Sequence, residues 1–399
     1  MHLRYSVLIA STVVAAIVAG CAGDPNGSPL PTVVAPKKGR TLFVASTGTE
    51  GVGNSCSSPY RVASGPDTAE EIQETIDQAE SSGATTVHIC AGEYVLEHRL
   101  ILNKPLRIVG SGMDETVLDG NHEVSIIDGL GAASSDRPGR IELADISLQH
   151  GAAESLSSDE GLGLILQSGG AVTAWTVTAT RVAFVDNGGG ICGGAVSLLG
   201  NYPALVGGSL LYDLSPRGRE INFDNARSTF VDASFIGNSA DFAGGAVAGM
   251  SLNLEGAPED VWLALLMTET FFCGAPPTSI ERSTFTGNEA LVGGAVYSVD
   301  PRTAMEIGKE IGESDVASAR PFTSRRMKEL YEMPALVVSG SNFADNRATG
   351  RNLLGITGLP GIGGGAIFTS GVAKISRSTF TGNGSPEDPV DDYDVTAGG

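Results

Sequence analysis

The block Phe285-Thr286-Gly287-Asn288, followed by Gly293-Gly294-Ala295-Val296, is the clearest copy of a pattern that recurs through the second half of the chain. Phe-x-x-Asn blocks begin at Phe184, Phe235, Phe285, Phe343 and Phe380, and Gly-Gly-Ala-Val or Gly-Gly-Ala-Ile blocks begin at Gly169, Gly193, Gly244, Gly293 and Gly364. The two kinds of block alternate along the chain. A short unit repeated in this way is typical of a solenoid, in which each coil stacks on the previous one.

Each position of the repeat has a structural interpretation. The phenylalanines are expected to point inward and to stack on their equivalents in neighbouring coils. The asparagines are expected to form a ladder at a turn, where each amide satisfies backbone groups of the adjacent coil. The paired glycines allow positive φ and close backbone approach. We therefore predict structural rather than ligand-contacting roles for Phe184, Asn187, Phe235, Asn238, Phe285, Asn288, Phe343, Asn346, Phe380 and Asn383.

Short apolar runs and one helix precede the repeats. The runs, separated by turn residues, are 41–45, 86–90, 100–102, 106–109, 116–118 and 125–127. Thr68 with Glu71 predicts a capping box, Ile72 and Ile76 share one face, and Gly83 is placed to end the helix. Many short strands without crossover helices cannot form an ordinary parallel sheet. We therefore predict an all-β fold, a right-handed parallel β-helix with an N-terminal capping helix and loop insertions.

Two segments carry resemblances to known families. Ile72–Tyr94 and Lys104–Gly120 resemble the amino-terminal coil of pectin-lyase-like β-helices, and this resemblance covers residues 41–130. It implies that the helix caps the open end of the rod, where backbone groups would otherwise be unpaired. Phe235–Val247 and Phe285–Tyr297 resemble the repeats of the polymorphic outer-membrane proteins of chlamydiae, which are surface adhesins, over about residues 140–399.

The amino terminus predicts export. Arg4 is followed by an apolar run, Val7–Val18, which is too short to span a bilayer comfortably and is typical of a signal peptide. Val18-Ala19-Gly20-Cys21 resembles the lipobox of bacterial lipoproteins, which implies a signal peptide over 1–20 and a lipid on Cys21. The alternative is an ordinary secretory signal with an unrelated cysteine. Residues 21–40, rich in Pro and Gly, are expected to form a flexible tether, and the protein is expected at the cell envelope or surface.

The chain carries a net charge of −21, which speaks against nucleic acid or anionic lipid as partners. Divalent cations, basic proteins and neutral glycans remain open, and no cofactor is predicted. Of the four cysteines after Cys21, we expect Cys56 to pair with Cys90, while a Cys192–Cys273 pair stays open. The four cysteines show no C-x-x-C or Cys/His zinc spacing, so no metal site is predicted.

Three insertions are expected to interrupt the rod, near 198–227, 251–278 and 299–337. The third has a partly helical pattern and carries the basic residues Lys309, Arg320, Arg325, Arg326 and Lys328. Insertions within a solenoid emerge as loops on one face, which is often the binding face. The third insertion is therefore either a binding loop or a solvated flap.

A polysaccharide-active enzyme is an alternative to a binding protein. A glycoside hydrolase needs two carboxylates at a set separation, and a lyase needs a positioned base. The available carboxylates lie in or beside repeat turns, and the histidines are scattered: Asp186, Asp232, Asp241, Asp345, His88, His98, His122 and His150. We assign no catalytic residue. Charged side chains from three or more successive coils converging in one cleft would favour an enzyme.

The sequence therefore predicts a lipid-anchored cell-surface adhesin or display module that binds a glycan or protein on another surface. The alternatives are a passive rod and a polysaccharide-active lyase, hydrolase or epimerase. The last block, at Phe380, is followed by Gly398-Gly399 where a Gly-Gly-Ala-Val block is due. We expect either a truncated gene product or a disordered tail at this end.

Overall fold

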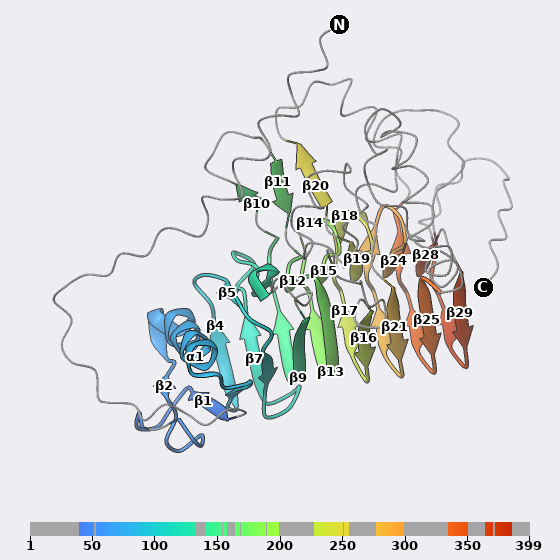
Figure 1. Ribbon diagram of the computed structural model, residues 1–399. Coiled ribbons are helices and arrows are strands. Elements are labelled where there is room, and N and C mark those ends of the chain that lie inside the picture. The colour runs from blue at the N-terminus through green and yellow to red at the C-terminus, as the bar shows by residue number, and fades with distance from the viewer. Residues whose placement is uncertain are drawn as a thin grey trace, which may run out of the picture.

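The computed structural model describes residues 40–51, 53–132, 140–153, 155–157, 164–167, 169–188, 190–198, 227–249, 251–254, 277–298, 334–349, 364–369 and 372–384. Within these ranges the chain forms a rod of stacked coils that runs from β1 at one end to β29 at the other (Figure 1). Several predicted features lie outside the described residues: the signal peptide, the tether, Cys21, Cys273, most of the three insertions and the carboxy-terminal end.

A parallel sheet of 16 strands runs along the rod. Its main path, in spatial order, is β2 (Arg61–Val62), β1 (Thr41–Ala45), β3 (Thr86–Ile89), β6 (Arg107–Val109), β9 (Arg140–Gln149), β13 (Thr176–Val185), β16 (Ser228–Val231), β21 (Thr278–Glu281), β25 (Leu336–Ser339) and β29 (Ala373–Ser376). The Phe-x-x-Asn blocks give a second row, β17 (Ser234–Ile236), β22 (Thr284–Thr286), β26 (Asn342–Ala344) and β30 (Thr379–Thr381), joined to β13. Strands β4 (Gly92–Val95) and β7 (Thr116–Asp119) pair with each other, and β7 also pairs with β9.

A second parallel sheet of seven strands completes each coil. Its order is β28 (Ile367–Thr369), β24 (Val296–Ser298), β19 (Val247–Gly249), β15 (Val196–Leu198), β12 (Val172–Ala174), β8 (Ile127–Gly129) and β5 (Leu100–Ile101). Short parallel pairs join β14 (Gly190–Cys192) to β18 (Ala240–Ala243), and β23 (Glu289–Ala290) to β27 (Arg347–Ala348). Since strand neighbours in both main sheets come from successive coils, the fold is the predicted parallel β-helix.

The core follows the repeat. The side chains that alternate inward from the strands form one continuous apolar cluster along the rod, which contains Phe184, Phe235, Phe285 and Phe343. The paired glycines lie where backbones approach closely. At Gly244, with φ of +61°, a Cβ atom would lie 2.4 Å from the Val247 carbonyl oxygen, so no larger residue fits there.

The helix α1 (Thr68–Ser82), preceded by the short 3-10 helix η1 (Gly65–Asp67), covers the amino-terminal end of the rod (Figure 1). Its buried residues Ile72 and Ile76 belong to the same core as the strands, as expected of a cap. Gly83 adopts φ of +74° and ends the helix as predicted. A second 3-10 helix, η2 (Leu130–Ala132), follows β8.

The predicted capping box at Thr68 and Glu71 was wrong. Thr68 lies inside the helix, and its hydroxyl donates to the carbonyl oxygen of Gly65. The backbone N–H of Ala69, which has no partner within the helix, instead donates to the side chain of Glu97 at 3.1 Å. The helix end is thus capped by a residue from the following coil, because the cap covers the rod and brings the two segments together.

The insertions are shorter than predicted at their carboxy-terminal ends. Thr278 begins β21, and Val337 lies within β25, because the strand before each Phe-x-x-Asn block has no sequence signature of its own. The start of the second insertion forms β20 (Ser251–Leu254), antiparallel to β11 (Leu164–Gln167), which in turn pairs with β10 (Ser155–Ser157). Within the part of the chain that the structure describes, no helix combines the length and apolar character needed to cross a membrane.

Candidate functional site

The phenylalanines of the repeat form a single stack. Successive ring centroids, from Phe184 to Phe380, lie 4.5–4.9 Å apart, and the ring planes are within 9° of parallel. The first four rings are fully buried and Phe380, in the last described coil, is partly exposed. None of the buried rings can contact a ligand, which is the structural role that the sequence predicts.

The asparagines form the expected ladder beside this stack. The side-chain amide of Asn288 donates to Oδ1 of Asn346 at 2.8 Å and to the carbonyl oxygen of Phe235 at 3.0 Å. Its own Oδ1 accepts from the backbone and side-chain N–H groups of Asn238. Asn187 and Asn383 make the equivalent bonds at the two ends of the ladder. All these polar groups are used within the rod, so the ladder stabilises the coils and offers nothing to a partner.

Charged residues from four successive coils do line up, along one corner of the rod. The equivalent turn position is occupied by Asp145, Arg181, Asp232, Arg282, Gly340 and Arg377, all with positive φ. Arg181 donates to both carboxylate oxygens of Asp145 at 2.5 and 2.8 Å, and Arg282 does the same to Asp232 at 2.8 and 3.0 Å.

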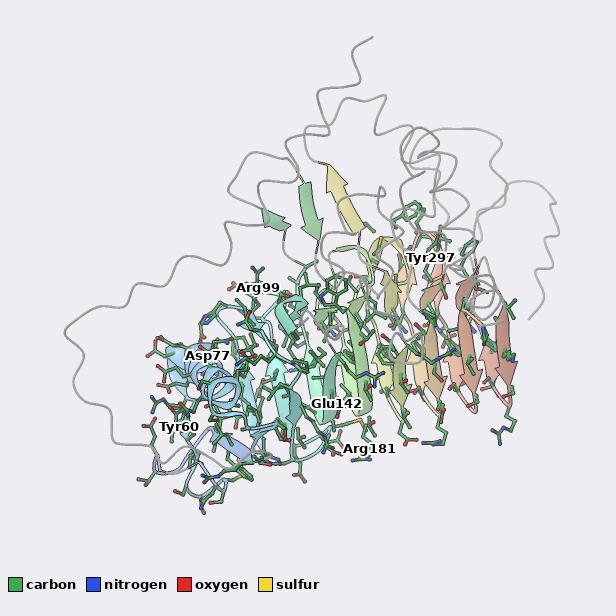
Figure 2. All side chains as sticks on the ribbon, viewed as in Figure 1. Tyr60, Asp77, Arg99, Glu142, Arg181 and Tyr297 are labelled. Atoms are coloured by element: carbon green, nitrogen blue, oxygen red, sulfur yellow. A yellow bond between two sulfur atoms is a disulfide. The ribbon has the colours of Figure 1, made fainter. Side chains whose placement is uncertain are left out.

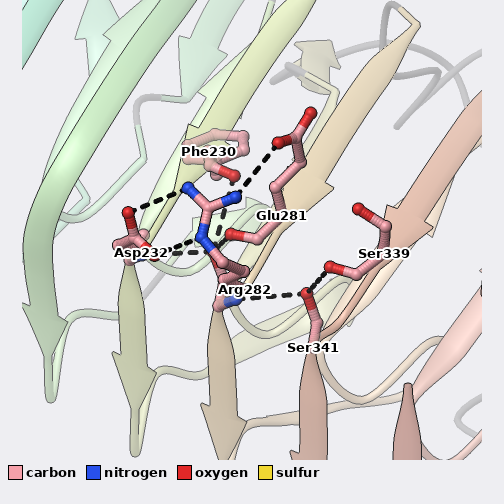
Figure 3. Close-up of polar contacts among 8 residues, drawn as sticks. Phe230, Asp232, Glu281, Arg282, Ser339 and Ser341 are labelled. Carbon is pink, nitrogen blue, oxygen red and sulfur yellow. Dashed lines mark hydrogen bonds and ion pairs between the residues drawn. The ribbon is translucent and has the colours of Figure 1, made fainter. Parts of the chain in front are cut away.

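Alternating charges therefore neutralise one another along this corner. Hydrogen bonds from the arginines hold the pKa values of Asp145 and Asp232 below their ordinary values. Arg282 also lies 3.5 Å from Glu281 (Figure 3). The arginine side chains are 52% and 57% exposed, and Arg181 lies at the edge of the rod opposite Tyr297 (Figure 2). Paired, solvated charges of this kind are suited to stabilising neighbouring coils rather than to acid–base chemistry.

The other carboxylates that the sequence offered are not brought together with these. Asp186 and Asp345 occupy the turn position before the ladder asparagines, with φ of 50° and 55°. Each aspartate side chain lies against a glycine of another coil, Asp186 against Gly237 and Asp345 against Gly382. A Cβ atom on that glycine would lie only 2.1–2.2 Å from the aspartate Oδ1. Asp241 lies elsewhere, on β18, and burial raises the pKa of its carboxyl. The predicted interpretation as turn residues is confirmed for Asp186 and Asp345 and is wrong for Asp241, which belongs to a strand.

The structure does assemble one titratable cluster that sequence reasoning missed. Oδ2 of Asp119, at the end of β7, lies 3.0 Å from Nδ1 of His150, and the ring of His122 lies 4.6 Å from that of His150. Burial alone would raise the pKa of Asp119, but hydrogen bonds from the Asn121 backbone, His150 and Gln149 hold it below its ordinary value. Asn121, His122 and His150 all have positive φ, between 53° and 56°.

This cluster has a recognisable chemical capacity. A carboxylate that holds one ring nitrogen of a histidine orients the ring and leaves the other nitrogen to exchange protons. Non-glycine residues with positive φ are also concentrated at functional sites in proteins. Asp119 and His150 are 31 residues apart and belong to successive coils, so only the register of β7 on β9 brings them together.

A second cluster lies on the first coils. Cys56 and Cys90 form the predicted disulfide, with their Cα atoms 5.8 Å apart. The His88 ring nitrogen and the two sulfur atoms all lie within 4.8 Å of one another. Cys192 is also disulfide-bonded. His98, the remaining candidate histidine, is exposed beside β5.

The three insertions leave and re-enter the rod at one corner. Between β12 and β13 the chain turns this corner with a single residue, Trp175. In the next three coils the same corner, between β15 and β16, β19 and β21, and β24 and β25, holds residues 199–227, 250–277 and 299–335. Both ends of all three segments are therefore fixed along one edge of a rigid scaffold. A further segment, between β27 and β28, leaves from another corner.

Comparison with known proteins gives little beyond the fold class. No family model matches the sequence, and no curated protein matches it. Among solved structures the chain is similar to the A-module of a mannuronan C-5 epimerase from Azotobacter vinelandii, with 12% identity and a TM-score of 0.25, over 81% of this chain and 93% of that one. The assignment of a parallel β-helix rests on the strand register described above, and this similarity adds nothing about activity.

Proposed function

We propose that this protein is a lipid-anchored cell-surface binding module, in which a rigid β-helix presents long segments from one edge to a glycan or protein on another surface. The main observation behind this proposal is the corner between β12 and β13. A single residue closes that corner in one coil, so the fold does not require the three long segments that occupy it in the next coils. Long segments fixed on a rigid scaffold are the usual position of binding loops.

The surface location is supported by the amino terminus and by the repeats. The resemblance of Val18–Cys21 to a lipobox implies a lipid anchor, and the tether at 21–40 would hold the rod away from the membrane. The repeats resemble those of chlamydial surface adhesins. Disulfides are typical of exported proteins, and the Cys56–Cys90 bond agrees with that compartment.

The anchor is tested by Cys21→Ser in the full-length protein expressed in a bacterial host. Without the lipid, the mature chain is expected in the soluble fraction, because the lipid on Cys21 is the membrane attachment that this proposal invokes. Fractionation followed by immunoblotting measures the distribution. A Cys21→Ala variant gives the same result if the thiol is the acceptor, and retention of both variants in membranes would refute the anchor.

The binding role is tested with the mature chain on arrays of glycans and surface proteins. A saturable ligand that competes in solution supports the proposal, and the net charge of −21 predicts that nucleic acids fail to bind. Mature chain that binds no glycan or protein of the arrays, while remaining folded by circular dichroism, counts against a binding module and favours a passive rod.

The Asp119–His150 pair favours a second candidate, a polysaccharide-active enzyme. An imidazole held by a carboxylate can act as a general base, which a lyase or epimerase requires. A panel of neutral and uronate polysaccharides tests it, assayed both for chain cleavage and for a change in the configuration of the uronate residues. Activity that is lost in His150→Gln and kept in His98→Gln would establish this candidate; a panel with no turnover would remove it.

A further inference from the structure

The first two coils carry three metal-binding side chains side by side, of which Cys56 and His88 are partly exposed and Cys90 is buried. His88 and Cys90 are two residues apart along β3 and its end, so they project from the same face of the strand. Cys56, from the loop between β1 and β2, closes over them. The two sulfur atoms and a His88 ring nitrogen all lie within 4.8 Å of one another.

The surroundings hold this arrangement in place. The ring of Phe43, from the adjacent strand β1, lies 4.9 Å from the His88 ring, and Phe43 is paired in register with His88. The Ser111 hydroxyl lies 3.4 Å from Nε2 of His88, a contact of the kind that orients a ligating imidazole.

The ligand set matches a thiophilic cation. Two thiolates and one imidazole form a three-ligand zinc site, with the fourth tetrahedral position left to solvent or substrate. In such a site Zn–S bonds of about 2.3 Å and a Zn–N bond of about 2.0–2.1 Å separate the ligand atoms by roughly 3.5–3.8 Å. Zinc binding therefore requires the two sulfur atoms, which are bonded to each other in the disulfide, to separate to about 3.8 Å. The imidazole nitrogen already lies within 4.8 Å of both sulfur atoms, and Cys56 belongs to a loop that can accommodate the movement.

We propose that reduction of the Cys56–Cys90 disulfide converts this cluster into a zinc(II) site formed by Cys56, His88 and Cys90. An external dithiol supplies two electrons and two protons, becomes oxidised to its own disulfide, and leaves two thiols on the protein. Zinc then displaces the two thiol protons, and the neutral imidazole binds without proton release. The metal takes over from the disulfide as the cross-link between the β1–β2 loop and β3, and it closes the first coil under reducing conditions.

The experiment uses the full mature chain with Cys21→Ser, Cys192→Ser and Cys273→Ser, so that Cys56 and Cys90 are the only thiols. The chain is reduced with a phosphine, which is not itself a thiolate ligand, and titrated with cobalt(II) as a spectroscopic probe. One equivalent is expected to give thiolate-to-cobalt charge-transfer and tetrahedral absorption bands, which zinc abolishes. The oxidised chain is expected to give none. Zinc should also raise the melting temperature of the reduced chain and leave that of the oxidised chain unchanged.

His88→Gln and His98→Gln form the matched pair of variants, since His98 is an exposed histidine outside the cluster. His88→Gln is expected to weaken cobalt binding at least about tenfold, and His98→Gln to leave it unchanged. If the triple variant does not fold, zinc X-ray absorption on the reduced, unsubstituted chain provides the second measurement, in which His88→Gln removes the nitrogen ligand. A folded, reduced chain without thiolate–cobalt bands, equal binding by both histidine variants, or a reduced chain that zinc fails to fold would each overturn the proposal.

Discussion

Phe285 lies between Phe235 and Phe343, with ring centroids 4.5 and 4.6 Å away, and is fully buried. Phe285→Ala is expected to lower the free energy of unfolding by about 3–5 kcal/mol, because the cavity has stacked rings on both sides and cannot collapse easily. Denaturant unfolding followed by circular dichroism measures the change. Thr286→Ala, an outward-facing neighbour on the same strand, should change stability by less than about 0.5 kcal/mol. Equal effects of the two substitutions would contradict the register.

The carboxyl group of Asp119 is expected to make the stability of the fold depend on pH. Its pKa in the folded protein is lowered, so the ionised carboxyl stabilises the fold at pH values above the unfolded pKa of about 3.9. That stabilisation is lost as the pH falls through the lower, folded-state pKa. In Asp119→Asn this acid-induced loss should be smaller between pH 5 and the acid limit, as measured by melting temperature against pH. Asp114→Asn, at an exposed turn, is the control and should retain the loss.

The capping helix shows how one element depends on another. The side chain of Asp67, at the N-cap of α1, makes no cap hydrogen bond, whereas Glu97 accepts from the Ala69 N–H across 28 residues of sequence. The acidic residues Glu70 and Glu71 lie in the first turn, where negative charge is favourable. The start of the helix is therefore held by the coil that it covers rather than by its own sequence.

Glu97→Ala is expected to cost about 0.5–2 kcal/mol, the usual effect of removing a cap, while Asp67→Ala should cost less. Thermal unfolding of the two variants, compared at one pH, measures the difference. A larger loss in Asp67→Ala would show that the local residue caps the helix and that the contact from Glu97 contributes little.

The strands that could be predicted from the sequence are those that contain a recognisable motif. The Phe-x-x-Asn blocks predicted β17, β22, β26 and β30, because ring and amide must both point inward to satisfy the solenoid core. The strands before them, such as β21 and β25, have no distinctive motif, so the sequence alone places their first residues within insertions. The Asp119–His150 pair and the approach of His88 to Cys56 depend on which residues of successive coils lie in register, which no single stretch of sequence specifies.

At the scale of the whole molecule, the rod and the long segments have separable roles. The ring stack, the asparagine ladder and the paired charges at the Asp145 corner connect each coil to the next without involving the β12–β13 corner. A solenoid of this kind is stabilised by contacts between neighbouring coils, and its stability depends only weakly on the length of its loops. Residues 199–226 and 299–334 should therefore be removable without loss of the fold, and they contain no cysteine.

The most direct test replaces 199–226 and 299–334 with single residues, as at Trp175, and leaves the segment containing Cys273 intact. Ligand affinity and thermal unfolding are then measured on the same protein, using a ligand identified on the arrays. The account predicts a melting temperature at or above that of the parent chain and loss of ligand binding. A folded variant that binds the ligand with the parent affinity would contradict it, because the binding surface would then lie outside the two segments that were removed.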